Sequence, residues 1–181
     1  MRTEFVNPFL AAAARVLSRE LGETPQRGEI RLAGSRVTPG EVTVAVGVTG
    51  DVEGTVLYGT SEITARRIVG RILGRDPFLL EDTLVESGAA ELGNMITGQA
   101  SADLERSGYR CDITPPAVLI GRDVLISTVE FRRLVIPLQL EVGRLEIHVA
   151  LQERGSVRRS QEAGSAEALR VLRSWSSQTP R

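Results

Sequence analysis

A glutamate and an asparagine three residues apart, Glu91 and Asn94, are the side chains in this sequence best placed for chemistry on a partner. They lie in "ESGAAELGNMITGQA", residues 86–100, whose non-glycine residues favour a helix. On a helix, Ser87, Glu91 and Asn94 fall within about 60° of one another, because their spacings are i+4 and i+3. A carboxylate can pair with a cation, and a carboxamide can accept a hydrogen bond from water while donating another. The spacing predicts an exposed polar patch.

Small residues surround this patch. Gly98 falls within its angular span, Ala90 lies near its edge, and Gly88 and Gly93 lie elsewhere on the helix. Each glycine inside a helix costs about 1 kcal/mol relative to alanine, so a gain elsewhere must offset it. Two interpretations remain open: close backbone packing, above all at Gly88 and Gly93, or a low surface that lets another macromolecule approach. Taken alone, E-x-x-N is a weak pattern that occurs often by chance.

The composition excludes several functional classes. The chain has 181 residues and a net charge of -1, which argues against broad electrostatic binding to nucleic acid or anionic membranes. All basic residues are arginine, so lysine Schiff-base and general-base chemistry is excluded. The single cysteine, Cys111, cannot form an internal disulfide and suits a reducing cytoplasm. No apolar run approaches the ~18 residues of a membrane span, so we expect no membrane insertion.

Three helices are expected to position the patch. The first begins near Asn7 and ends at Gly22, and the second begins near Thr60 or Ser61 and ends at Gly74. The third runs from about residue 82 to residue 107. Inward-facing residues are expected on the second helix at Ile63, Ile68, Val69, Ile72 and Leu73, and on the third at Val85, Ala89, Leu92 and Ile96.

The remaining segments alternate with period two, as strands do. Residues 42–48 and 55–60 predict a hairpin, and 117–127, 128–142 and 144–153 predict further strands. In the last strand we expect His148 to face solvent. The element order predicts an α+β fold, with helices packed on a mainly antiparallel β-sheet.

The chain divides into a domain, residues 1–154, and a polar Ser/Arg-rich extension, residues 155–181. Within the extension, "SAEALRVLRSW" has the spacing of a short amphipathic helix. A disordered or loosely packed tail is the alternative interpretation.

With these elements in place, the sequence resembles the CheC/CheX/FliY family of chemotaxis phosphatases, and the CheX branch most closely. The family signature, an Asp or Ser one turn before E-x-x-N and a proline about 22 residues later, is met by Ser87, Glu91, Asn94 and Pro116. The likeness extends over most of residues 7–152, including "GDVEGTVLYGTSEITARRIVGRILG" and "VIPLQLEV". Only the third helix carries E-x-x-N, which is typical of the CheX type.

The resemblance implies a phosphatase that hydrolyses the aspartyl phosphate of a CheY-like response regulator. It implies that Glu91 anchors the regulator through a lysine and that Asn94 orients the attacking water. The chain itself is expected to bind no cofactor or metal, and Mg²⁺ is expected in the receiver domain. A homodimer is also implied. The candidate site residues are Glu91 and Asn94 for catalysis, and Ser87, Ala90 and Gly98 for partner binding.

Two alternatives belong to other functional classes. The first is a non-catalytic adaptor or signalling scaffold that binds a receiver with the same helix. The second is a structural component like the flagellar switch proteins that contain this fold, although those usually carry additional domains. Cys111 is expected to be an inert, partly buried thiol, because no cationic partner accompanies it in the sequence.

Overall fold

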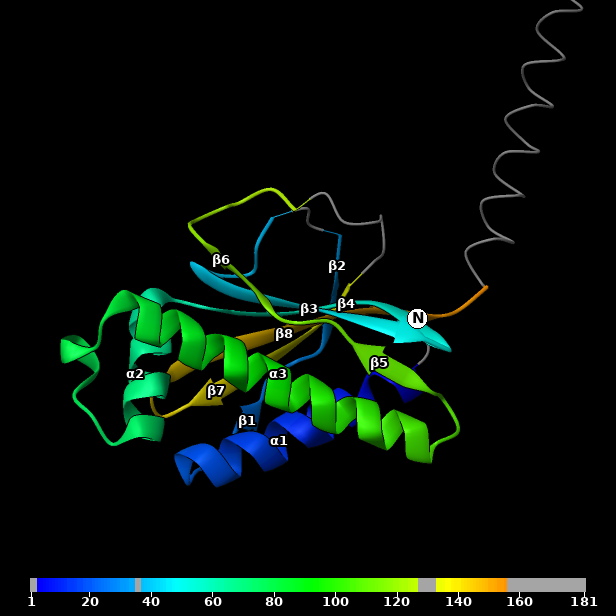
Figure 1. Ribbon diagram of the computed structural model, residues 1–181, viewed down its shortest axis with the longest axis horizontal. Coiled ribbons are helices and arrows are strands. Elements are labelled where there is room, and N and C mark those ends of the chain that lie inside the picture. Colours follow the sequence, from blue (N-terminus) through cyan, green and yellow to red (C-terminus); the bar gives the residue numbers. More distant parts are fainter. Residues whose placement is uncertain (1–2, 35–36, 127–132, 156–181) are drawn as a thin grey trace, which may run out of the picture.

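A computed structural model describes residues 3–34, 37–126 and 133–155 of the chain, and within them three α-helices pack on one antiparallel sheet (Figure 1). The helices are α1 (Asn7–Leu21), α2 (Glu62–Leu73) and α3 (Asp82–Arg106), with 3-10 turns at Thr3–Phe5 and Pro77–Leu79. The strands are β1 (Gln26–Arg27), β2 (Arg31–Ala33), β3 (Val42–Gly50), β4 (Val52–Thr60), β5 (Cys111–Ile113), β6 (Ala117–Ile120), β7 (Arg133–Leu140) and β8 (Gly143–Glu153). The predicted α+β fold is confirmed. The amphipathic segment expected in the extension lies outside the described residues.

The sheet has the order β1-β7-β8-β4-β3-β5, with β2 also paired to β7 and β6 also paired to β3. The predicted hairpin is present as β3–β4, β7 and β8 form a second one, and all of the strand pairs are antiparallel. In the central register Val44 lies opposite Tyr58, and Tyr58 lies opposite Ile147 on the next strand. Alternate residues of these strands therefore share one face.

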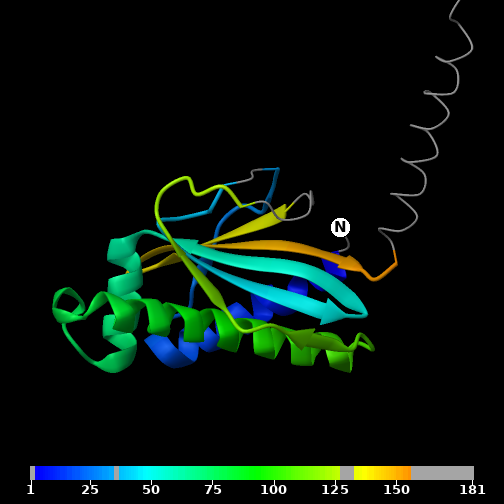
Figure 2. The same cartoon turned by 45° about the horizontal axis from the view of Figure 1, so that its top comes forward.

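Helices α1 and α3 lie side by side on that face (Figures 1 and 2). The strand alternation supplies the sheet side of the core, and the amphipathic stripes of the helices supply the other side. Helix α2 packs across one end of this layer, where Ala65 and Val69 meet Val85 of α3. The fully buried side chains at the centre include Phe9, Leu17, Val46, Ile96, Ile136 and Ile147.

Three of the four ends of α1 and α2 follow the predicted signals, whereas α1 begins after Val6 without a side-chain cap hydrogen bond. Ser61 caps α2 by accepting a hydrogen bond from the Thr64 amide at 3.2 Å. Gly22 and Gly74 end α1 and α2 with φ of 69° and 62°, a conformation that favours glycine.

The inward face of α2 is narrower than predicted. Ile68 and Val69 are buried, but Ile63 and Leu73 are exposed, so the prediction for these two was wrong. Ile63 lies about 140° around the helix from Ile68 and about 120° from Val69, so it points away from the buried side, and Leu73 is the last residue of the helix. The prediction had placed Ile63 on the wrong side of α2.

Glycines let α3 approach its neighbours closely. A Cβ on Gly93 would lie 2.9 Å from Val44 Cγ1, and one on Gly88 would lie 2.8 Å from two methyl carbons of Val69. The buried stripe is as predicted at Val85, Leu92 and Ile96, with Ala89 half-buried. Close packing therefore explains Gly88 and Gly93.

Gly98 is different. The nearest atom to a Cβ built there is Ile113 Cδ1, at an ordinary contact distance of 3.8 Å. Packing does not require a glycine at this position.

The opposite face of the sheet is covered in part by the segment that precedes β3. A Cβ on Gly59 would point from that face and would meet Pro39 Cγ at 2.5 Å. His148 lies on this face but is only 5% exposed, so the prediction that it faces solvent was wrong. Strand alternation identifies the face, but not the segment that crosses it.

His148 takes part in a charged cluster on this covered face. Its Nε2 lies 3.0 Å from Glu146 Oε2, while the Nη2 atoms of Arg31 and Arg144 lie 2.9 and 2.5 Å from Glu146 Oε1. Burial alone would raise the pKa of Glu146, but the His148 hydrogen bond and the two guanidinium charges lower it overall. Glu146 is therefore ionised at neutral pH.

Gly93→Ala and Gly98→Ala should change stability in opposite directions. At Gly93 the added methyl group overlaps Val44, and an overpacking cost of about 1–3 kcal/mol should exceed the helix-propensity gain of about 1 kcal/mol. At Gly98 the methyl group has room, so the free energy of unfolding should rise by up to about 1 kcal/mol. Chemical denaturation of both variants measures the difference, and equal effects would contradict the close-packing explanation.

Stability should fall as the pH drops from 7 to 5.5, because of His148. Burial lowers the pKa of His148 in the folded state; the Glu146 hydrogen bond opposes this, and the charges of Arg133 and Arg31 add to it. The unfolded chain, with a histidine pKa near 6.5, binds the proton first, so acid favours unfolding. The slope cannot exceed about 1.4 kcal/mol per pH unit for one proton.

Denaturation of wild type and His148→Gln across this range tests the assignment. The chain has a single histidine, so the variant should show a flatter dependence. Equal slopes in the two proteins would show that His148 is not the titrating group.

Candidate functional site

Helix α3 presents the candidate residues on its outer face, opposite the stripe that packs on the sheet. Glu91 and Ser87 are exposed, and Asn94 is half-buried, one helical turn before Gly98, whose Cβ position is nearest to Ile113 of β5. Ala90 and Gly98 are also half-buried. The five candidates therefore lie on one accessible side of one helix, which we call the α3 patch (Ser87, Ala90, Glu91, Asn94 and Gly98).

The two central side chains of the α3 patch have no hydrogen-bond or ion-pair partner among the described residues. These are the Glu91 carboxylate and the Asn94 carboxamide. Ser87 differs, because its hydroxyl donates to the carbonyl oxygen of Thr83, one turn earlier, at 2.8 Å. Glu91 and Asn94 are thus available to an incoming molecule, while Ser87 is partly engaged within its own helix.

The charge around Glu91 is negative. From Asp82 to Glu105, α3 carries no basic residue, and Glu86 lies five residues before Glu91. The first basic residue of the helix, Arg106, pairs with Asp103 at 2.8 Å, more than three turns beyond Glu91. An exposed carboxylate with no basic residue nearby on its own helix favours a partner that brings a basic group.

Helix α3 is fixed along its length by polar contacts. At its start, Arg66 of α2 binds Asp82 and donates to the Leu80 carbonyl at 3.0 Å. Near its end, Ser101 donates to the Cys111 carbonyl of β5 at 2.9 Å. Arg15 of α1 binds Asp103 at 2.5 Å. The patch therefore lies on an anchored element, as a site that must hold one geometry requires.

A buried pair of hydroxyl groups lies beneath the patch, and sequence reasoning missed it. The Tyr58 hydroxyl on β4 is 2.7 Å from Thr97 Oγ1, which donates to the Gly93 carbonyl at 2.8 Å. The available signals were that Tyr58 occupies an inward-facing position of its strand pattern and that Thr97 follows Asn94 by three residues. Predicting the contact would have required the register of helix on sheet.

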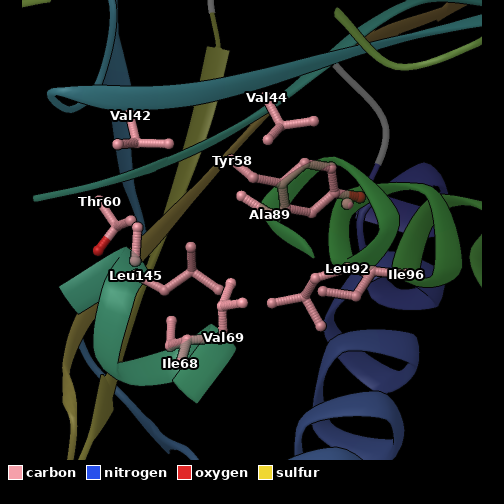
Figure 3. A pocket seen from close by; sticks show the side chains of 12 residues that line it. Val42, Val44, Tyr58, Thr60, Ile68, Val69, Ala89, Leu92, Ile96 and Leu145 are labelled. Carbon is pink, nitrogen blue, oxygen red and sulfur yellow. The ribbon is translucent and has the colours of Figure 1, made fainter. Parts of the chain in front are cut away.

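An apolar cavity of about 20 Å³ adjoins this pair (Figure 3). Its walls come from β3, β4, α2, α3 and β8, and they include Val44, Tyr58, Val69, Leu92 and Leu145. A space of this size holds at most about one water molecule. This cavity is therefore too small to hold a substrate.

Neither Cys111 nor a group of metal-ligating side chains forms a second catalytic centre among the described residues. Burial raises the pKa of the Cys111 thiol, and the charges of Asp51, Asp112 and Glu105 raise it further, so the thiol is a poor nucleophile. Within the described ranges, no three His, Cys, Asp or Glu residues are grouped as metal ligands. Pro116 lies in the linker between β5 and β6, beside α3.

The described helices also lack a candidate for crossing a bilayer: none combines the required length with enough apolar character.

Comparison with known proteins places this geometry in a family. The family model described as "Chemotaxis phosphatase CheX" matches residues 42–139, a range that includes β3, β4, α2 and the whole of α3. The CheY-P phosphatase CheX of Thermotoga maritima is 32% identical over 128 residues, which cover 71% of this chain and 83% of that protein.

Solved structures agree. The chemotaxis protein CheX of Desulfovibrio desulfuricans superposes with a TM-score of 0.72 at 27% identity, over 83% of this chain and 99% of that one. A chain of the CheX-CheY-BeF3-Mg²⁺ complex from Borrelia burgdorferi gives 0.68 at 30% identity, over 84% of this chain and 100% of that one. The chain described here therefore belongs to the CheX family of chemotaxis phosphatases.

Proposed function

We propose that this chain hydrolyses the aspartyl phosphate of a CheY-like response regulator, with α3 as the surface that meets the receiver domain. The observation that carries the proposal is the α3 patch, where Glu91 and Asn94 are accessible and have no partner among the described residues. Family membership, a relative named CheY-P phosphatase and a neighbour solved with CheY support the same reaction.

Hydrolysis of an aspartyl phosphate requires few catalytic groups from the enzyme. An aspartyl phosphate is an activated acyl phosphate, so the main requirement is a water held in line with the bond between phosphorus and the aspartyl oxygen. Attack by that water forms the new phosphorus–oxygen bond, the aspartate leaves as a carboxylate, and the proton of the water passes to the phosphate. The water is the nucleophile, so no nucleophilic side chain is needed, which fits the poor nucleophilicity of the Cys111 thiol.

Asn94 is proposed as the residue that holds the water. Its carbonyl oxygen can accept a hydrogen bond from the water, and its NH₂ group can donate to a phosphoryl oxygen without a change of charge. The half-buried position of Asn94 limits the directions that its short side chain can take. The Mg²⁺ that this chemistry uses is proposed to belong to the receiver domain.

Glu91 is proposed as the anchor. Its exposed carboxylate would pair with a basic group of the receiver, which by family resemblance is a lysine, and so fix the register of the two proteins. Ala90 and Gly98 would allow close approach through their small size. Ser87 would make a minor contact, because its hydroxyl hydrogen is used by Thr83 and only its acceptor capacity remains.

The proposal includes a cytoplasmic location, where response regulators work, and a homodimer, as the likeness to the CheX branch implies. The single cysteine of the sequence supports the location.

Asn94→Ala should abolish most of the turnover while leaving docking intact. Loss of one positioned polar group should lower kcat by on the order of 10²-fold. The measurement is the rate of phosphate loss from phosphorylated CheY-like receivers with Mg²⁺ present, together with the affinity for a receiver that carries beryllium fluoride. Gln99→Ala, which removes another α3 amide on the side facing Arg15, is the matched control and should retain turnover.

This variant also separates an enzyme from an adaptor. An adaptor would bind the receiver but would show no turnover for Asn94→Ala to remove. The proposed function would be contradicted if the wild-type protein accelerated phosphate loss from none of the receivers of its own cell.

Glu91→Ala should weaken docking more than it changes the chemical step. Loss of one exposed ion pair should raise KM and the receiver Kd by roughly 3- to 10-fold, and the effect should shrink at high salt because ions screen exposed charges. Glu105→Ala is the control, since it removes an exposed carboxylate from the same helix almost four turns further on. Equal effects of the two variants would mean that general negative charge, and not a pairing at Glu91, attracts the receiver.

A further inference from the structure

We propose that Tyr58 is a positioning residue for Asn94, acting through Thr97 and the carbonyl group of Gly93. This inference rests on the proposed function, because it assigns how the geometry of the water-holding amide is set. It extends the site from the surface of α3 to a buried residue of β4 that a partner cannot contact, since Tyr58 is only 4% exposed.

The hydroxyl groups form a directed chain from sheet to helix. Thr97 has one hydroxyl hydrogen, and it is donated to the Gly93 carbonyl at 2.8 Å. The Tyr58 hydroxyl, 2.7 Å from Thr97 Oγ1, must therefore be the donor to Thr97. Burial raises the pKa of the Tyr58 phenol well above its usual value, and the Thr97 hydrogen bond only partly offsets this, so the donor keeps its proton.

The end of this chain is the peptide group that joins Gly93 to Asn94. Because a peptide bond is planar, fixing the Gly93 carbonyl also fixes the nitrogen and Cα of Asn94. The Asn94 side chain has no partner of its own among the described residues, so the direction in which its carboxamide leaves the helix depends on this backbone.

The surrounding contacts do not supply the same constraint. The Tyr58 ring crosses from β4 to α3 among Val44, Leu92 and Ile96, next to the apolar cavity (Figure 3). Apolar packing is non-directional, and the adjoining space of about 20 Å³ leaves this part of the interface incompletely filled. Among the residues around this cavity, the hydroxyl chain is the directional contact between the sheet and the turn from Gly93 to Thr97, and it adds a fixed rotation to the close packing of Gly93 on Val44.

A displaced Asn94 should affect turnover more than docking. Glu91 is exposed and has a longer side chain that can adjust to a small rotation, whereas the amide must meet a water and a phosphoryl oxygen at once. Loss of the hydroxyl chain should therefore lower kcat with little change in KM. A general loss of stability would not produce this division at a temperature where the variant is fully folded.

Tyr58→Phe tests the inference, with Tyr109→Phe as the matched control. The chain has two tyrosines, and the Tyr109 hydroxyl donates to Glu4 at 3.0 Å, more than a dozen residues beyond Asn94. With a phosphorylated CheY-like receiver and Mg²⁺, Tyr58→Phe should lower kcat about 10-fold or more and leave KM within about 2-fold, while Tyr109→Phe retains both. Unchanged kcat in Tyr58→Phe, beside an active wild type, would overturn the inference.

Thr97 variants and amide exchange complete the test. Thr97→Ser keeps the hydroxyl group and should retain turnover, Thr97→Val should match Tyr58→Phe, and the double variant should be no worse than either, because the two groups act as one unit. Hydrogen exchange of the α3 amides at residues 93–98 should be faster in Tyr58→Phe and unchanged in Tyr109→Phe. If the wild type shows no turnover, the proposed function fails, and the exchange result alone decides whether Tyr58 holds this turn.

Discussion

The contact between the middle of α3 and the sheet is the constraint on which the rest of the structure depends. Gly93 brings the helix backbone against Val44 and Tyr58, at a separation that a side chain would prevent. Gly88 brings it equally close to Val69 of α2. Glycine in a helix costs about 1 kcal/mol, so these positions lose local stability that tight packing offsets. This close packing holds the outer face of α3 at a fixed distance from the sheet.

A helix held in this way suits a reaction that takes place in another protein. The space beneath α3 is small and apolar, and the α3 patch lies on the outer side of the helix. A small-molecule enzyme needs a concave pocket that excludes water, whereas a receiver domain brings its own cleft with the phosphate inside. A convex helix that carries one carboxylate and one amide is then sufficient for the reaction. Small neighbours such as Ala90 and Gly98 keep the helix surface narrow enough to approach that cleft.

Sequence reasoning predicted the features that follow from local rules. The C-terminal end of α1, both ends of α2, the buried stripe of α3 and the exposure of Glu91 were confirmed, since each follows from capping or from a 3.6-residue period. The prediction that failed for His148 depends on distant segments, because it lies on the sheet face that the chain before β3 covers in part. The prediction for Ile63 failed for a local reason, because this residue lies on the side of α2 away from Ile68 and Val69.

The Tyr58–Thr97 pair shows why the site could be predicted only in part. Each residue alone is ordinary, an aromatic residue in a strand and a threonine in a helix, and neither belongs to the E-x-x-N pattern. Their meeting at 2.7 Å depends on the rotation of α3 and its register against β4, which no short-range rule specifies. Motifs identify the groups that touch a partner, but the groups that hold them in place are found only by their contacts.

The positions of Glu91 and Asn94 on α3 match the two tasks proposed for them. A charged anchor acts over several ångströms and tolerates movement, so the exposed position and long side chain of Glu91 suit this task. A residue that aligns a water for in-line attack needs one orientation, so a short amide on the half-buried flank, with its backbone tied to the sheet, suits that task. Exchanging the two residues would keep the composition of the α3 patch but would place the amide at the exposed position and the charge at the half-buried one. The same two residue types in exchanged positions would therefore not support hydrolysis.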